Sequence, residues 1–362
     1  MILKIFIVWR IGLFLITYLG SQTFPKIANS GIGAIGPNQP FDYWASWAQW
    51  DGGHYFSISQ RGYQLLGDYA FFPLYPSVVK LLDFATNNTL LSGLIISNIS
   101  FLLFLIVFAK VLTLRFNKSV AFSSVITFLL FPTTFFAVSF YSESLFLLLT
   151  VLVFLFLKNR NFLLASIAAS FASVTRLPGV TLAIAISWAY FANLQFNLGK
   201  IKSRSLYICV AFFGFAVYSI FLAANLNDPF AYLSSQSQWQ RAVTDPISTI
   251  FSYLWAFAHL EHRPINDYFD LLLTTAFLAI LILGIRKIPT SWWIFSILVI
   301  LLPASTGTLT SMPRYLLASL GAFVILGQYF NKSPQVKLTL WTISLALQAI
   351  LATLFINGYW VA

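Results

Sequence analysis

The sequence is poor in charged residues and contains a single cysteine. Only 9% of its 362 residues are Asp, Glu, Lys or Arg, whereas about a quarter of the residues of a soluble globular protein are charged. This shortage excludes a soluble enzyme, a disordered chain and a nucleic-acid-binding domain. Cys209, the only cysteine, lies in an apolar run, so the sequence contains neither a disulfide framework nor a zinc-binding pattern.

Apolar residues fill the chain instead. They make up 59% of the sequence, the mean hydropathy is +0.82, and apolar stretches of about 15–20 residues recur, as expected of a chain embedded in a bilayer. We therefore predict an all-α polytopic protein of the cell membrane that forms a single integral-membrane domain over residues 1–362. The first apolar run lacks a small-residue cleavage site and is expected to be retained as a helix. About eleven spans are predicted: 4–22, 90–109, 119–137, 143–157, 162–175, 178–193, 205–224, 267–284, 291–303, 315–330 and 338–356.

The charges predict an orientation for these spans. With the N-terminus inside, fourteen of the 21 Lys and Arg residues fall on the inner side, whereas all ten acids fall on the outer side. Cationic loops remain in the cytoplasm, so the net charge of +11 is an orientation signal rather than a nucleic-acid footprint. Two long and chemically varied outer loops, about 23–89 and 225–266, are predicted to form the catalytic face on the non-cytoplasmic side.

The first outer loop combines tryptophans with an aspartate. Three tryptophans at three-residue spacing predict an interfacial helix on the membrane surface: Trp44, Trp47 and Trp50. Asp51 follows, and the glycines at 52 and 53 are expected to turn the backbone sharply. A carboxylate at this depth could accept a proton from a hydroxyl nucleophile, or it could simply cap a helix. His54 could orient Asp51 or contact substrate, although it could also be a structural hydrogen-bonding residue.

An ordered series of motifs runs from about residue 44 to 320 and consists of Trp50–Tyr55, Phe71–Pro76, Tyr141–Phe146, Thr175–Gly179, Asn227–Phe230, Trp239–Arg241 and Ser311–Tyr315. This series resembles the PIG-V-like mannosyltransferase family. The resemblance implies a GT-C fold with interfacial helices in the first outer loop. It also implies a polyprenyl-phosphate sugar donor, typically of mannose, and an acidic base in that loop, which here maps to Asp51. We do not assign the acceptor of the eukaryotic family members to this chain.

A lipid-phosphate donor requires cations near the departing phosphate. Arg176 and Arg314 lie at outer membrane edges and are candidates for this role, although arginines there could also snorkel to the interface. Glu143 could cap its helix, pair with one of these arginines or bind the acceptor. Inversion requires one carboxylate as base, in contrast to the carboxyl pair of hydrolases.

The second outer loop contributes two further candidates. Trp239 and Arg241 could stack on and hydrogen-bond to a sugar, or Trp239 could anchor the loop at the interface. His259, Glu261 and His262 form only a weak metal-binding pattern, and no Asp-x-Asp pair is present, so we predict neither a metal nor a cofactor.

Together these observations predict an inverting glycosyltransferase. It would transfer a sugar, with mannose as the expectation, from a polyprenyl-phosphate donor to a hydroxyl of a lipid, glycan or protein acceptor. The alternative is a flippase for lipid-linked sugars or another polytopic transporter. The acids fall in loops or at span ends, which disfavours proton-coupled transport.

Overall fold

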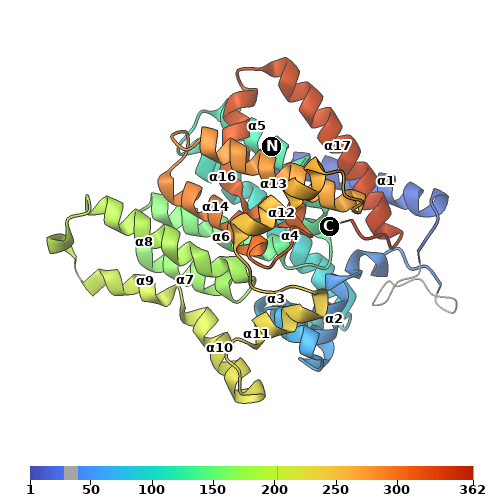
Figure 1. Ribbon diagram of the computed structural model, residues 1–362, viewed down its shortest axis with the longest axis horizontal. Helices are drawn as coiled ribbons and strands as arrows, with labels where there is room; N and C mark the ends of the chain where they lie inside the picture. The colour runs from blue at the N-terminus through green and yellow to red at the C-terminus, as the bar shows by residue number, and fades with distance from the viewer. Residues whose placement is uncertain (28–39, 202, 362) are drawn as a thin grey trace. The chain divides into compact units, whose positions relative to one another are not determined.

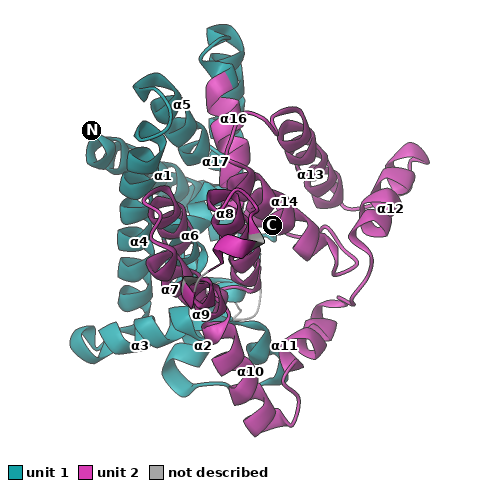
Figure 2. Cartoon of the chain, turned by 90° about the vertical axis from the view of Figure 1, so that its left-hand side faces the viewer, with its two compact units in different colours: residues 1–148, 329–361 teal, residues 149–328, 362 magenta. Residues whose placement is uncertain are grey.

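The computed structural model describes residues 1–27, 40–201 and 203–361, and this part of the chain is helical without β-strands. Residues 28–39 of the predicted first outer loop lie outside the described residues. The chain forms two compact units, one of residues 1–148 and 329–361 and the other of residues 149–328 (Figure 2). The first unit therefore combines the two ends of the sequence, and the chain crosses between the units within α6 and α16.

The first unit contains the helices of both ends (Figure 1). α1 packs against α17, and α4 packs against α3 and α5. The bounds are α1 Ile2–Thr23, α2 Asp51–Arg61, α3 Leu74–Thr86, α4 Thr89–Thr113, α5 Lys118–Leu129 and α17 Pro334–Ile356, with the 3₁₀ turns η1 Ala45–Ala48, η2 Leu66–Ala70 and η3 Thr134–Val138. Two helices, α6 Glu143–Lys158 and α16 Leu320–Phe330, are divided between the two units.

The second unit is built from shorter helices. α14 packs against α8, α7 against α9, and α12 against both α13 and α14. The bounds are α7 Phe162–Ser173, α8 Leu182–Asn193, α9 Tyr207–Val210, α10 Phe213–Leu226, α11 Ala231–Ser234, α12 Pro246–Ala258, α13 Ile265–Leu283, α14 Thr290–Ala304 and α15 Met312–Tyr315, with the turns η4 Leu177–Thr181, η5 Leu198–Lys200, η6 Ser203–Leu206, η7 Ser235–Trp239 and η8 Leu316–Ala318.

By length and composition, four described helices could cross a membrane: α1, α4, α13 and α17. They correspond to four of the predicted spans. Other predicted spans are not continuous helices. The span predicted over 119–137 ends as α5 at Leu129 and resumes as η3, because Pro132 has no backbone N–H for a helical hydrogen bond. Likewise, the span predicted over 315–330 consists of the last residue of α15, η8 and α16.

The predicted tryptophan-lined helix is wrong. Residues 45–48 form a single 3₁₀ turn, after which Gln49 adopts an extended conformation. Trp44 is exposed, but Trp47 is fully buried, with the Arg10 guanidinium 5.0 Å from its ring centre. The three-residue spacing therefore reflects a short turn with one buried ring rather than a helix face in contact with lipid.

An aromatic core fixes the remainder of the first outer loop. It consists of Ala48, Tyr55, Ile58, Phe71, Tyr75, Val79, Ile96 and Phe140. Tyr75 is at its centre, since its ring is edge-on to those of Tyr55 and Phe140 and its hydroxyl lies 2.9 Å from Ser97 Oγ of α4. Burial of these aromatic rings supplies the driving force that holds α2 and α3 against α4.

Candidate functional site

The turn before Asp51 is strained and held in place. Trp50 has φ 56° and ψ −121°, which costs energy for a residue with a Cβ atom and persists only where neighbouring contacts enforce it. The Tyr141 hydroxyl donates to the Gln49 carbonyl at 2.8 Å. Gln49 Nε2 in turn donates to the Ile356 carbonyl at 3.1 Å, and the Trp50 ring packs edge-on against Trp360 at 5.1 Å. The end of α17 and the segment that follows it therefore help to fix this turn.

Asp51 is the first residue of α2 and is partly exposed. The prediction that the following glycines make the sharp turn is wrong, because neither is among the residues of positive φ and the turn is made at Trp50. Gly52 instead permits close packing: a Cβ atom there would lie 3.2 Å from the Phe140 carbonyl oxygen. The absence of a side chain lets α2 approach the 140–141 segment.

His54 is oriented by a buried carboxylate. Its Nδ1 lies 3.0 Å from Asp68 Oδ1, and its ring stacks on Phe71 with a centroid distance of 4.6 Å. Asp68 is 1% exposed, and its Oδ2 accepts hydrogen bonds from the backbone N–H groups of Gln64 and Leu65 at 3.1 and 3.0 Å. This carboxylate fixes the position of the imidazole, which lies one helical turn beyond Asp51.

Glu143 is the first residue of α6 and is 3% exposed. This confirms the prediction that Glu143 lies in the first turn of a helix. The preceding Ser142 Oγ lies 2.7 Å from the Tyr55 hydroxyl, which ties the start of α6 to α2. Glu143 belongs to the first unit, whereas Arg176 and Arg314 belong to the second, so its pairing with either arginine stays a prediction.

In the second unit, the three candidate arginines converge on Tyr315. The Arg176 and Arg314 guanidinium carbons lie 5.3 and 5.7 Å from the centre of its ring. Arg241 Nη1 donates to the Tyr315 hydroxyl at 3.2 Å. Arginine side chains remain charged at any physiological pH. We call Arg176, Arg241, Arg314 and Tyr315 the arginine–tyrosine cluster, and it concentrates positive charge around one phenol.

Backbone pairing places Arg241 in this cluster. The N–H groups of Ala242 and Thr244 donate to the carbonyls of Thr306 and Ser305 at 3.2 and 2.8 Å. The guanidinium bridges two acceptors, since Nη2 donates to the Thr310 carbonyl at 3.1 Å while Nη1 reaches the Tyr315 hydroxyl. The predicted contact of Arg241 with a sugar is not tested, but the structure shows what positions its side chain.

Close packing of two turns places Arg176. This residue has extended backbone angles and precedes η4. A Cβ atom on Gly179 would lie only 2.3 Å from the Ala172 carbonyl, so only glycine permits η4 to pack this tightly against the end of α7. The Thr175–Gly179 segment therefore directs Arg176 through the shape of its turn.

A buried carboxylate positions Arg314. This side chain is 5% exposed and lies in α15, where Pro313 occupies a first-turn position that suits proline. The backbone N–H groups of Ser311 and Met312 form hydrogen bonds to the Asp270 carboxylate of α13. An acidic group at a helix N-terminus is favourable, and here it fixes the start of the short helix that contains Arg314 and Tyr315.

The surrounding arginines change the acidity of Tyr315, which lies in α15 and outside the long apolar helices. Burial by itself raises the pKa of the phenol. The charges of Arg241, Arg314 and Arg176 outweigh this effect and lower the pKa to about 8. The hydroxyl therefore titrates much closer to neutral pH than an ordinary tyrosine.

The second predicted outer loop contains an unpredicted helix, α12, and the remaining candidates. Trp239 ends η7 and is 37% exposed. The His259 ring stacks on Trp255 at 3.8 Å, and Glu261 lies 3.8 Å from Arg263. No group of three or more metal-ligating side chains capable of holding an ion occurs among residues 1–27, 40–201 and 203–361.

Sequence reasoning missed three residues that organise these sites: Asp68, Asp270 and Tyr315. In the sequence, Asp68 and Asp270 do not differ from the other outer acids, and the signal that distinguishes them is deep burial, which composition does not reveal. Tyr315 belongs to the Ser311–Tyr315 motif, but the sequence predicts no role for it. Its significance depends on arginines that are separated from it by up to 139 residues along the chain (315 minus 176).

Comparisons with known proteins agree with this architecture. The family model described as mannosyltransferase (PIG-V) matches residues 3–233. The structure is similar to the crystal structure of ArnT from Cupriavidus metallidurans bound to undecaprenyl phosphate, with a TM-score of 0.56 and 12% sequence identity. The similarity covers 96% of this chain but 63% of ArnT. It establishes a shared fold, and no curated protein matches the sequence.

Proposed function

We propose, on the premise that this chain belongs to the mannosyltransferase (PIG-V) family, that it transfers a sugar from a polyprenyl-phosphate donor to an acceptor hydroxyl with inversion. The family model spans well over half of the chain, and mannose is the sugar that the family suggests. ArnT, which has a similar fold, was solved with undecaprenyl phosphate. That ligand supports a polyprenyl phosphate as the lipid part of the donor.

The arginine–tyrosine cluster is the observation that carries this proposal. Three guanidinium groups around one phenol provide charge-assisted donors, which bind phosphate more strongly than neutral ones do. As the sugar leaves, negative charge accumulates on the lipid phosphate, and donors already in place stabilise that charge without reorganisation. We assign Arg176, Arg241 and Arg314 to the donor phosphate.

We assign the base to Asp51 of the first unit. In an inverting transfer the acceptor oxygen attacks the anomeric carbon, the bond from that carbon to the phosphate oxygen breaks, and the acceptor proton passes to a carboxylate. The lipid phosphate departs as an anion and needs little help from an acid. His54, held by Asp68, and Glu143 are assigned to contacts with substrate, as is Trp239.

We further propose that the reaction occurs on the non-cytoplasmic face of the cell membrane. This assignment rests on the positive-inside rule and on the outer position of all ten acids in the predicted topology. The acceptor would be a lipid, a glycan or a protein hydroxyl.

Mass spectrometry of glycans and glycolipids from cells that lack the protein tests the proposal. Cells complemented with the wild type should regain the missing mannosylated product. An Asp51→Asn variant should produce it about 10²–10⁴ times more slowly, the usual contribution of a general base. Asp42→Asn is the matched control, because Asp42 caps its turn through Trp44 and Ala45 and asparagine can cap equally well. Full activity of a folded Asp51→Asn protein would show that the base is elsewhere.

A reconstituted vesicle assay separates this enzyme from the alternative, a flippase for lipid-linked sugars. The purified protein is given polyprenyl-phosphate mannose together with an extract containing acceptors, and both new glycosidic bonds and movement of the donor across the bilayer are measured. Formation of a bond is the expected result. Movement of the donor without any bond formation would instead establish the transporter.

A further inference from the structure

Tyr141 has no part in the sugar transfer proposed above, yet its hydroxyl contacts the turn before the proposed base. The side chain is 1% exposed, and its ring lies edge-on to those of Phe136 and Phe355, with centroid distances of 5.1 and 6.0 Å. Such aromatic contacts hold a buried ring in one orientation. The hydroxyl therefore donates to the Gln49 carbonyl, at 2.8 Å, from a fixed position.

This hydrogen bond holds one peptide plane. The carbonyl of Gln49 belongs to the peptide group that also contains the nitrogen of Trp50. Its oxygen accepts a second hydrogen bond, from the Gly52 N–H at 3.0 Å, so both of its lone pairs are used. Rotation of the plane would change the φ angle of Trp50, which is 56° and lies outside the range that a residue with a Cβ atom prefers. Because Asp51 follows directly, the direction of its side chain depends on the same plane.

Gly52 makes room for the tyrosine ring. A Cβ atom at this position would lie 3.3 Å from Tyr141 Cε2 and 3.2 Å from the Phe140 carbonyl oxygen, so a larger residue would displace the ring or its backbone. The backbone also ties the two segments together, because the Phe140 N–H donates to the Trp47 carbonyl at 2.9 Å. Two motifs whose bonded residues are 92 positions apart in the sequence therefore meet in one closely packed contact.

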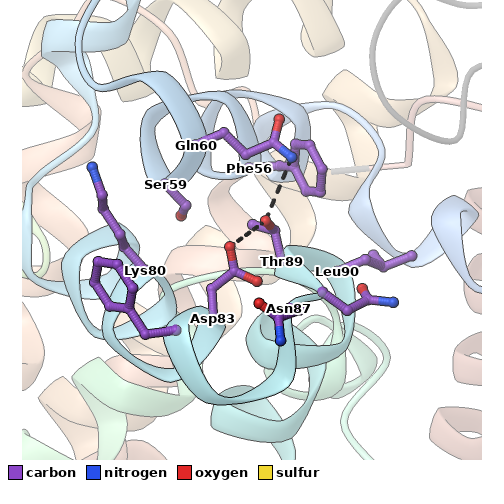
Figure 3. Close-up of a pocket in the computed structure, with 10 residues that line it drawn as sticks. Phe56, Ser59, Gln60, Lys80, Asp83, Asn87, Thr89 and Leu90 are labelled. Atoms are coloured by element: carbon purple, nitrogen blue, oxygen red, sulfur yellow. Dashed lines mark hydrogen bonds between the residues drawn. The ribbon is translucent and has the colours of Figure 1, made fainter.

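The far face of α2 does not replace this contact. Successive helical residues are rotated by roughly 100°, so Phe56 and Gln60 lie on the face opposite to Asp51. That face borders a cavity beside α3 and the start of α4 (Figure 3). Its hydrogen bond, from Gln60 Nε2 to Thr89 Oγ1, is long at 3.4 Å. Contacts at the start of α2, rather than on this face, therefore fix Asp51.

We propose that Tyr141 is a positioning residue, which holds the Asp51 carboxylate in its reactive direction through the peptide group between Gln49 and Trp50. The inference rests on the proposed sugar transfer, in which Asp51 accepts the proton of the acceptor hydroxyl. Tyr141 does not touch the substrate in this scheme. Its hydrogen bond maintains the strained backbone of Trp50, and such strain persists only where surrounding contacts enforce it.

Removal of one oxygen atom tests this role. Tyr141→Phe keeps the ring against Gly52, but the Gln49 carbonyl loses one of its two hydrogen bonds. The kcat for transfer from polyprenyl-phosphate mannose should fall about 10- to 100-fold, because a misplacement of about 1 Å can cost about a hundredfold. The Kd of the donor should not change, since the arginine–tyrosine cluster belongs to the second unit. A general loss of structure would instead alter both quantities.

Tyr75→Phe is the matched control. Tyr75 is also fully buried, but its hydroxyl donates to the Gly93 carbonyl of α4, at 3.2 Å, and not to the Trp50 turn. Both variants should lower the melting temperature, because each loses a buried hydrogen bond, whereas only Tyr141→Phe should lower kcat. Gly52→Ala is a second test variant, which keeps the hydroxyl but crowds the ring. It should also lower kcat and leave the donor Kd unchanged.

The outcomes separate this inference from the proposed function. No transfer by the wild type would refute the proposed function, and full activity of Asp51→Asn would refute the proposed base. If both behave as expected, a wild-type kcat in Tyr141→Phe overturns the positioning role. An equal loss of kcat in Tyr75→Phe overturns it as well. Where Tyr141→Phe does not fold, a wild-type kcat in Gly52→Ala has the same meaning.

Discussion

Ionisation of Tyr315 should weaken binding of the donor as the pH rises through about 8. The arginine–tyrosine cluster contains three guanidinium charges, and burial together with those charges gives the phenol a pKa of about 8. Below this pH the phenol is neutral and the cluster has a charge of about +3. Above it, the tyrosinate cancels one positive charge, so the attraction for a phosphate falls. Donor affinity is therefore greatest below pH 8 and declines above it.

The size of this effect follows from the distances within the cluster. We take a separation of about 6 Å between a bound phosphate and the phenolate oxygen, similar to the 5.3 and 5.7 Å between the guanidinium carbons and the centre of the Tyr315 ring. Repulsion between unit charges at that distance is about 3 kcal/mol at an effective dielectric constant of about 20, and about 0.7 kcal/mol in bulk water. These limits correspond to a roughly three- to hundredfold loss of affinity.

The assay measures binding of a polyprenyl-phosphate sugar to the purified protein between about pH 7 and pH 9.5. This donor is a phosphodiester whose charge is constant over that range, so any slope belongs to the protein. Tyr315→Phe retains the ring between the arginines but cannot ionise, and its affinity should fall less with rising pH than that of the wild type. Tyr253→Phe is the matched control, because Tyr253 also packs against an arginine, with Arg263 at 4.8 Å. A slope as steep in Tyr315→Phe as in the wild type, or a flat profile in the wild type, would refute the reasoning.

Three further predictions concern the residues that position the sites. Arg241→Lys retains the charge but cannot bridge Thr310 and Tyr315, so the donor Kd should rise about tenfold, measured with the same binding assay, while the melting temperature stays constant. Asp68→Asn alters a side chain that accepts two backbone hydrogen bonds and lies 3.0 Å from His54 Nδ1, and it should lower the free energy of unfolding by about 1–3 kcal/mol, seen as a lower melting temperature. Gly52→Ala places its Cβ atom 3.2 Å from the Phe140 carbonyl oxygen, a contact that the backbone must relieve by a shift of a few tenths of an ångström, and should lower the melting temperature; an unchanged melting temperature would contradict this packing argument.

The sequence predicted the helical membrane architecture and most of the residues that the structure groups together. Long apolar runs indicate helices because each run must satisfy its backbone within the bilayer. α1, α4, α13 and α17 accordingly lie where the hydropathy placed them. The motifs also contain Arg176, Arg241 and Arg314, which the fold brings together around Tyr315.

What the sequence could not provide was local geometry. Spacing of three residues suits both a helix face and a 3₁₀ turn, so the tryptophan pattern gave the wrong element and did not indicate that Trp47 is buried. The glycine at position 52 implied a bend, whereas its role is close packing and the bend occurs at Trp50. Asp68 and Asp270 resemble any outer acid until burial and long-range contacts are known.

The bond between Gln49 and Ile356 has a consequence for the timing of synthesis. It joins residues 307 positions apart. The contact between Trp50 and Trp360 likewise cannot form until Trp360 has been synthesised. At about 5–20 residues per second, a ribosome needs roughly 15–60 s to reach the second partner after making the first. During that interval the turn at Trp50 lacks the contacts from Ile356 and Trp360 that hold it, so a nascent chain is expected to be inactive until α17 and the segment after it have been made.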